Sequence, residues 1–269
     1  MHPLVAAACV VVSVFTTACQ SSPTKPTPTV TAERHPERGV DSDLRPQFAA
    51  FGLPPRGQGA RPTCSIFTTV AAFEFALATL RGRGQRLSVE YANWAANAAT
   101  GRADDGDFFQ CALTGYETFG LCRDELWPYA ATFPVGTTPP PAALVDGGRL
   151  LGEAGTQLGM QWLKPPDGKQ GLDDAQFRAV QQTLADGWPV AAGSGHSRLL
   201  VGYRSEPSAP GGGVFLTLDS ALAAFAEVPA AYVKNELFDV FAIRALREAP
   251  KQRSDEPAAV TAAGSRAPG

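Results

Sequence analysis

A cysteine and a histidine stand where a nucleophile and its base would be expected. Cys64 follows a Pro-Thr pair and begins an apolar run, so its sulfur is predicted to lie at the positive end of a helix, which favours the reactive thiolate. His196 follows a Gly-Ser-Gly turn roughly 130 positions later, a known separation for a thiol and imidazole that act together. Such a pair can attack a carbonyl carbon and carry the proton. Taken singly, a cysteine is more often inert packing and a histidine an ordinary polar residue.

A third group has to orient the imidazole, and Asp219 is the candidate. The strands that contain His196 and Asp219 are predicted to form a hairpin with Tyr203 opposite Val214. In that register Asp219 is a diagonal neighbour of His196 on the same face. A slip of one residue would move it to the other face. Alone, an aspartate followed by serine is more typical of a turn or a cap.

Two further observations bear on this pair. His196 is the only histidine of the expected folded domain, because His2 and His35 fall in segments without the pattern of a fold. Gln58 lies in a glycine-containing loop six residues before Cys64. Its side-chain amide could donate to an oxyanion that the backbone N–H of Cys64 also holds. Without the other residues it would be an ordinary loop glutamine.

Helices are predicted first along the chain. Residues 64–80 are apolar on nearly every face, which indicates a helix buried in the middle of a domain. Membrane insertion is the alternative, but Glu74 at the centre and arginines near both ends favour a core helix. Further helices are predicted over 89–99, capped by Ser88, over 108–119 before Gly120, and within 172–187, where Gly187 stops the helix.

Strands are predicted after Pro189, where short β-prone runs alternate with Gly, Ser and Pro. These runs cover residues 189–192, 196–203, 214–218 and 237–243. Helices followed by antiparallel strands predict the α+β class.

The spacing of these blocks resembles the papain-like cysteine peptidases, particularly bacterial members. The run "GQGARPTCSIFTTVAAFEFA" is similar to the glutamine loop, nucleophile and central helix of that family. "LSVEYANWAANAATG", "DDGDFF" and "FGLCRDELWPY" resemble the next blocks, "PVAAGSGHSRLLVGY" the histidine strand, and "VFLTLDS" stands in place of the asparagine block. The resemblance covers most of residues 47–244.

The resemblance implies a helical N-terminal half with a central buried helix, packed against an antiparallel sheet or barrel in the C-terminal half. It implies that Cys64 is the nucleophile, His196 the general base and then acid, Asp219 the orienting group, and Gln58 part of the oxyanion hole. The expected activity is hydrolysis of peptide bonds in a peptide or protein substrate through a thioester, with no cofactor and no metal. The alternatives are a peptidyl transferase on the same scaffold and a catalytically silent peptide-binding or envelope-assembly protein.

Departures from the family pattern surround the nucleophile and the orienting group. Ser65 stands where the family has tryptophan after the cysteine, and Thr63 where it has glycine before it. Asp219 replaces asparagine, a change that still allows the imidazole to be held and stabilises its cation. Ala221-Leu222 replaces the Trp-Gly that shields the histidine, and a wetter ion pair is weaker.

Substrate binding is expected to involve Gly106 and Asp107, which stand where the family has two glycines. We expect Gly106 to pair with substrate backbone and hypothesise that Asp107 favours cationic peptides. The alternative is a solvated acidic loop. Only seven positions separate Pro189 from His196, where the family inserts a longer loop that helps form a substrate pocket.

The amino terminus indicates export. Residues 4–15 are apolar or small but are fewer than the ~20 needed to span a bilayer, so residues 1–18 are predicted to be a signal peptide. "TTACQSS" resembles the lipobox of bacterial lipoproteins, which implies Cys19 as the lipid-bearing residue and a location in the cell envelope, with plain secretion as the alternative. Residues 19–44 are then a flexible tether, 45–247 the peptidase domain and 248–269 a disordered tail.

Composition and cysteine content complete the expectations. A net charge of −3 gives no basic surplus for phosphates, which excludes nucleic acid as the expected partner. No P-loop, GxSxG or paired CxxC motif occurs. Cys111 and Cys122 are candidates for a disulfide, provided that the chain brings their Cα atoms within about 7 Å.

Overall fold

The computed structural model describes residues 41–246. The expected signal peptide 1–18, the lipidation site Cys19 and the tail 248–269 therefore lie outside the described residues. The helices are α1 (Arg45–Ala50), α2 (Cys64–Arg81), α3 (Val89–Thr100), α4 (Phe109–Phe119), α5 (Pro141–Ala154), α6 (Asp174–Ala185) and α7 (Ala230–Glu236). The strands are β1 (Ser42–Asp43), β2 (Leu158–Lys164), β3 (Val190–Gly193), β4 (Arg198–Ser205), β5 (Gly213–Asp219), β6 (Ala224–Pro229) and β7 (Asp239–Ala245).

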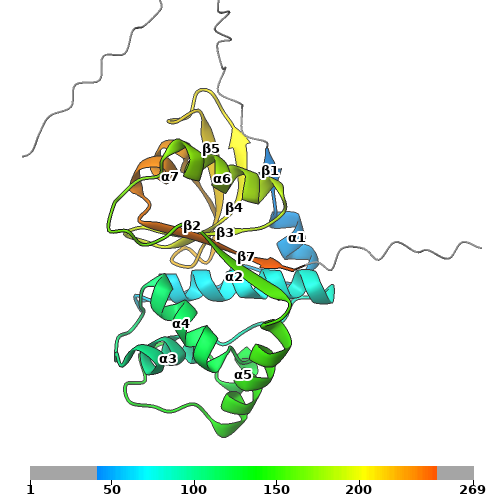
Figure 1. Cartoon of the computed structure of the whole chain (residues 1–269), viewed down its shortest axis with the longest axis vertical. Coiled ribbons are helices and arrows are strands. Elements are labelled where there is room, and N and C mark those ends of the chain that lie inside the picture. Colours follow the sequence, from blue (N-terminus) through cyan, green and yellow to red (C-terminus); the bar gives the residue numbers. More distant parts are fainter. Residues whose placement is uncertain (1–40, 247–269) are drawn as a thin grey trace, which may run out of the picture. The chain divides into compact units, whose positions relative to one another are not determined.

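Helix α2 is the buried centre of the domain. It runs between the sheet and helices α3 to α5 (Figure 1), and its side chains from Ser65 to Ala78 are all buried. Among residues 41–246 it is the one helix long and apolar enough to span a membrane, but most of it is packed inside the protein. The predicted core helix is confirmed. Its central Glu74 is satisfied by Arg56 at 2.7 Å and Arg86 at 2.8 Å, so the buried carboxylate is paired, as burial of a charge requires.

The other predicted helices begin and end where local chemistry indicates. The hydroxyl of Ser88 accepts a hydrogen bond from the Tyr91 N–H and caps α3. The backbone of Gly120 has a φ of 72° directly after α4, and Gly187 has a φ of 88° just beyond α6. A residue with a Cβ adopts these angles at a cost, so glycine ends both helices readily.

The strands form one antiparallel sheet in the order β2-β7-β3-β4-β5-β6, with β1 paired to β4. The described domain is thus mixed helix and antiparallel sheet, as the α+β prediction requires. The expected order of helices first and strands second is wrong in detail. Strand β2 precedes α6 in the chain and pairs with β7, far from it in sequence.

The hairpin of β4 and β5 changes register part-way along. Near the turn Tyr203 pairs with Phe215, one position away from the predicted partner. A bulge after Leu200 then shifts the register by one residue. The strand ends that carry the chemistry therefore meet in the predicted alignment, and Asp219 reaches His196 although the pairing at the turn was predicted wrongly.

The boundary between tether and domain lies earlier than predicted. Ser42 and Asp43 form β1 on the edge of β4, and the N–H of Leu44 donates to the Val201 carbonyl at 2.8 Å. Leu44 itself is buried in the core. Because these residues complete an edge of the sheet, the end of the expected tether 19–44 belongs to the fold.

Candidate active site

Cys64 is the first residue of α2, with Thr63 immediately before it. Its sulfur is partly buried and makes hydrogen bonds with the His196 imidazole and the Ser197 backbone N–H. Burial alone would raise the pKa of this thiol, but the hydrogen bonds and the charge of His196 outweigh burial and lower the pKa. A cysteine with a depressed pKa at a helix N-terminus is poised to be a thiolate nucleophile.

His196 lies in the bend between β3 and β4, two residues before the strand that was predicted to begin with it. Its Nε2 is 2.8 Å from Oδ1 of Asp219. Because a carboxylate only accepts, Nε2 carries the hydrogen and the other ring nitrogen is left for the sulfur. The hydrogen bond with Cys64 raises the pKa of His196, Asp219 raises it further, and burial opposes both. The pair therefore favours thiolate with imidazolium.

Asp219 is buried, and both of its carboxylate oxygens accept hydrogen bonds. Oδ1 accepts from His196 and from the backbone N–H groups of Ala221 at 2.9 Å and Leu222 at 3.3 Å. Oδ2 accepts from Nε of Arg198 at 2.8 Å. Burial alone would raise the pKa of Asp219, but the hydrogen bonds with His196 and Arg198 lower it. The carboxylate stays ionised and fixes the plane of the imidazole.

Arg198 is a member of the site that the sequence reasoning missed. Besides Asp219, it donates to the His196 carbonyl at 3.2 Å and to the Tyr232 hydroxyl at 3.1 Å. Tyr232 is in turn 2.8 Å from the hydroxyl of Ser194. The sequence does contain a signal for Arg198. It is two positions after His196, and side chains two positions apart along a strand point to the same face.

Gln58 is tied to the strand end that carries the carboxylate. Its backbone N–H donates to the Ser220 carbonyl at 2.9 Å, and its side-chain oxygen accepts from the Ser220 hydroxyl at 2.6 Å. Its amide nitrogen donates one hydrogen to the Arg61 carbonyl at 2.8 Å. The amide is thereby held in one orientation, and its second hydrogen has no partner among the described residues. No hydrogen bond joins Gln58 to Cys64 in the described residues.

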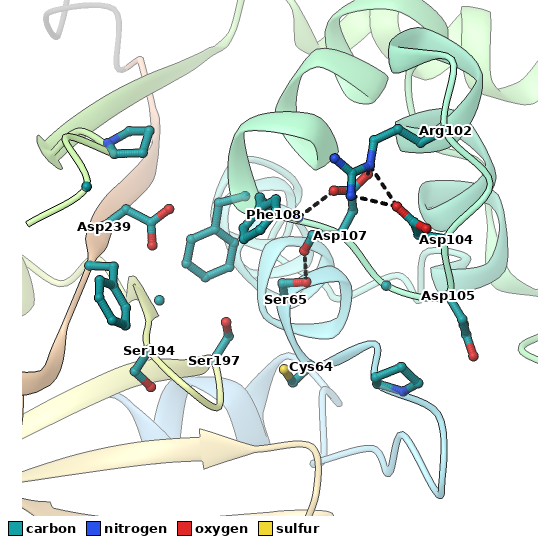
Figure 2. Close-up of a pocket in the computed structure, with 17 residues that line it drawn as sticks. Cys64, Ser65, Arg102, Asp104, Asp105, Asp107, Phe108, Ser194, Ser197 and Asp239 are labelled. Atoms are coloured by element: carbon teal, nitrogen blue, oxygen red, sulfur yellow. Dashed lines mark hydrogen bonds and ion pairs between the residues drawn. The ribbon is translucent and has the colours of Figure 1, made fainter. Parts of the chain in front are cut away.

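A cavity of about 610 Å³ opens beside the sulfur. Figure 2 shows Cys64 and Ser197 at one side of it, with Asp107 and Arg102 on another and Asp239 across from them. A peptide laid in this cavity would bring a carbonyl group to the thiol. Within residues 41–246 no group of three or more His, Cys, Asp or Glu side chains is arranged to hold a metal ion.

Solved structures share this arrangement of elements, whereas no protein-family model and no curated protein matches the sequence. Xylellain, a cysteine protease from Xylella fastidiosa, aligns with a TM-score of 0.59 and 17% identity over 78% of this chain and 87% of its own. Digestive procathepsin L 3 of the Tenebrio molitor larval midgut gives 0.56 and 17% over 81% and 73%. The chain has the papain-like fold. The protease and lectin-like domains of Cwp84, a surface layer associated protein of Clostridium difficile, give 0.51 and 18% over 76% and 53%.

The papain-like fold places Gly106 and Asp107 on the cavity, but it does not support the hypothesis for Asp107. The carboxylate of Asp107 has no exposed side-chain surface. It accepts from the Phe108 N–H at 2.8 Å and lies 3.3 Å from Nε of Arg102. Because this charge faces inward, it does not attract a cationic peptide in this structure. Gly106 has a φ of 87°, and its N–H donates to Asn93, so only its carbonyl is left for a substrate backbone.

The candidate disulfide does not form. Cys111 and Cys122 are both free thiols in the described structure. Cys111 is in the first turn of α4 and Cys122 lies beyond the end of that helix. At 1.5 Å per residue the helix alone separates the two regions by about 12 Å, too far for a disulfide. Burial raises the pKa of the Cys111 thiol to about 11 and that of Cys122 to about 12. Cys64 alone among the three has a lowered pKa.

Arg198 is expected to act as a positioning residue for the triad. Replacing it by methionine leaves the buried Oδ2 of Asp219 without its charged donor, so we expect kcat/KM for a peptide to fall about 10-fold, mostly through kcat. The charge of Arg198 lowers the pKa of His196. Its removal should therefore move the alkaline limb of the pH profile to higher pH.

A control variant and a rescue variant separate this role from a loss of folding. Arg204→Met removes an exposed arginine of the same strand and should leave both the rate and the pH profile unchanged. Arg198→Lys restores the charge and should recover part of the rate. An Arg198→Met enzyme with the wild-type pH profile and kcat would remove the assigned role.

Proposed function

We propose that this protein is a cysteine peptidase that hydrolyses peptide bonds through a thioester on Cys64. The observation that carries the proposal is the meeting of a low-pKa thiol, an imidazole and a buried carboxylate, with the thiol lining a cavity. This is the arrangement that nucleophilic acyl transfer requires. The papain-like fold, which cysteine proteases of several organisms share, supports the same reading.

The proposed reaction has two halves. The Cys64 thiolate attacks the peptide carbonyl, and the oxyanion accepts from the Cys64 N–H and from the second amide hydrogen of Gln58. The C–N bond then breaks, and the imidazolium of His196 gives its proton to the leaving amine. A water molecule next loses a proton to His196 and attacks the thioester, which releases the carboxylic acid and regenerates the thiolate.

The imidazole of His196 is partly exposed to solvent, so other residues have to orient it. Ala221 and Leu222, which stand where the papain-like family has the Trp-Gly pair, are exposed. Instead Arg198 and Tyr232 support the carboxylate from the side. We infer that these polar residues supply the orientation, because a held carboxylate keeps the imidazole in one tautomer and plane.

The function is tested by incubating a peptide library with the purified protein. New amino termini that appear in the wild type, and disappear after alkylation of Cys64, support the peptidase. Products joined to an added amine, in place of free acids, indicate a transferase. Peptides that bind without any cleavage indicate the catalytically silent binding protein and overturn the proposal.

For location we propose the bacterial cell envelope, with a lipid on Cys19 as the anchor. Support comes from the lipobox-like sequence and from the structural similarity to a surface layer associated protease. In a bacterial host, Cys19→Ala is expected to shift the protein from the detergent phase to the aqueous phase and to abolish incorporation of a labelled fatty acid. Secretion without a lipid predicts that wild type and variant both lie in the aqueous phase.

A further inference from the structure

The cavity beside Cys64 contains a carboxylate that the proposed reaction does not use. Asp239, the first residue of β7, is 9% exposed, and its side chain makes no hydrogen bond or ion pair with any residue of 41–246. Figure 2 shows its carboxylate directed into the cavity. Two other carboxylates of the cavity already form ion pairs, Asp104 with Arg102 at 2.6 Å and Asp105 with Arg61 at 2.8 Å.

Packing holds Asp239 where it is. Its partner across the sheet is Gly193, the last residue of β3. A Cβ added to Gly193 would lie 1.7 Å from Oδ1 of Asp239 and 3.1 Å from the ring of Phe109. The carboxylate therefore fills space that only a glycine leaves open. Gly193 thus leaves the room that the carboxylate of Asp239 occupies, and it does not supply a hydrogen-bond donor to that carboxylate.

Apolar side chains line the cavity together with Asp239. Phe109, Phe238 and Pro166 line the same cavity, and Phe238 is 42% exposed. Burial raises the pKa of Asp239, and the nearby charge of Lys164 opposes that rise. An unpaired carboxylate among apolar groups is costly, and a cation placed against it would lower that cost. Phenyl rings at the same time favour an aliphatic stem or a guanidinium plane.

Lys164 cannot supply that cation, because its three hydrogens are already used. It is 2% exposed, and Nζ donates to Asp167 at 2.6 Å, to the Lys169 carbonyl at 2.8 Å and to the Phe238 carbonyl at 2.6 Å. These bonds join the loop after β2 to the strand entry beside Asp239. Lys164 thus fixes two walls of the cavity and leaves the carboxylate open toward its interior.

We propose that this cavity binds a lysine or arginine side chain of the substrate peptide, with Asp239 accepting from its ammonium or guanidinium group. The inference rests on the proposed peptidase function, because it concerns the cavity that opens at Cys64. It assigns to Asp239 the preference for cationic peptides that Asp107 does not provide. The aliphatic stem of the side chain would lie along Phe109 and Phe238.

The test uses matched peptides that differ in one side chain. Arginine is compared with citrulline, its uncharged analogue, at each of three positions before the cleaved bond. The wild type is expected to show a kcat/KM ratio of arginine to citrulline on the order of 10 to 100 at one position. In Asp239→Asn that ratio should fall to about 1, because the amide offers no charge. Asp104→Asn, which removes an already paired carboxylate of the same cavity, should keep the wild-type ratio.

An equilibrium measurement makes the inference independent of turnover. In Cys64→Ala, the arginine peptide should bind on the order of 10 to 100 times more tightly than the citrulline peptide, and adding Asp239→Asn should remove the difference. Cleavage with equal rates for both peptides overturns the inference while leaving the peptidase intact. Asp239-dependent binding without cleavage by the wild type leaves the cationic cavity and overturns the peptidase. Equal binding of both peptides overturns the inference whether or not cleavage occurs.

Discussion

Cys64→Ser is expected to lower kcat/KM for any peptide substrate by on the order of 10⁴ or more. A hydroxyl has nearly the same size as the thiol, so the pocket and the helix are preserved. It does not ionise near neutral pH, and the pairing that lowers the pKa of Cys64 depends on a group that can carry the negative charge. Initial rates with a fluorogenic peptide at matched protein concentration measure the loss.

Cys111→Ser is the matched control for this variant. Cys111 is also partly exposed, but burial raises the pKa of its thiol to about 11, and its neighbour is Asp107 instead of an imidazole. The control should keep the wild-type rate within about threefold. A Cys64→Ser protein that cleaves peptides as fast as the wild type would show that the sulfur is packing, as most cysteines are.

His196→Ala is expected to slow alkylation of Cys64 by iodoacetamide at pH 6 on the order of 100-fold. In the wild type the pKa of Cys64 is lowered, so the thiolate persists as the pH falls below the ordinary thiol range. Without the imidazole, burial remains as the larger influence and raises the pKa. The midpoint of the rate against pH should therefore move upward, and the thiolate should be lost at pH 6.

The measurement is a second-order labelling rate from pH 5 to 10, with the modified peptide identified by mass spectrometry. Asp219→Asn should give an intermediate shift, because it keeps a hydrogen-bond acceptor for the imidazole but not the charge that raises the pKa of His196. An unchanged profile in His196→Ala would show that the imidazole does not influence the sulfur.

The parts of the fold that could be predicted are those set by local sequence. Helix α2 is apolar on nearly every face, and α3 has its own serine cap. Neither feature requires knowledge of a distant partner. The meeting of Cys64, His196 and Asp219 could be predicted in the same way, because Cys64 begins a helix and the other two residues lie near the open end of a hairpin. The predicted alignment of β4 and β5 holds near His196 and Asp219 only because a bulge after Leu200 offsets the wrong pairing predicted at the turn.

The parts that were missed are held by contacts distant in sequence. Helix α5 contains Gly147 and Gly148, which disfavour a helix, yet Gly147 packs against Tyr91 where any Cβ would clash. Strand β2 is partly exposed on both faces and shows no alternation, and its structure comes from pairing with β7. Local propensity does not depend on either packing partner, so it does not predict these two elements.

The charged residues of the site likewise depend on contacts that the sequence does not show. The sequence predicts a substrate-binding charge at Asp107 because it does not show that Arg102 and the Phe108 N–H are the partners of this carboxylate. In the sequence Asp239 is one polar residue in an apolar strand, and only the structure shows that it lines the cavity without a hydrogen bond or ion pair in the described residues. Sequence identifies which residues can ionise, while burial and pairing decide which of them face a ligand.

The central claim is a covalent acyl group on Cys64, and acid quenching during steady-state turnover of an ester substrate tests it most directly. Intact-mass and peptide-level mass spectrometry should find one acyl group per protein on the peptide that contains Cys64, and hydroxylamine should remove it. Turnover with no acyl group on Cys64, or with the acyl group on another residue, would contradict the account.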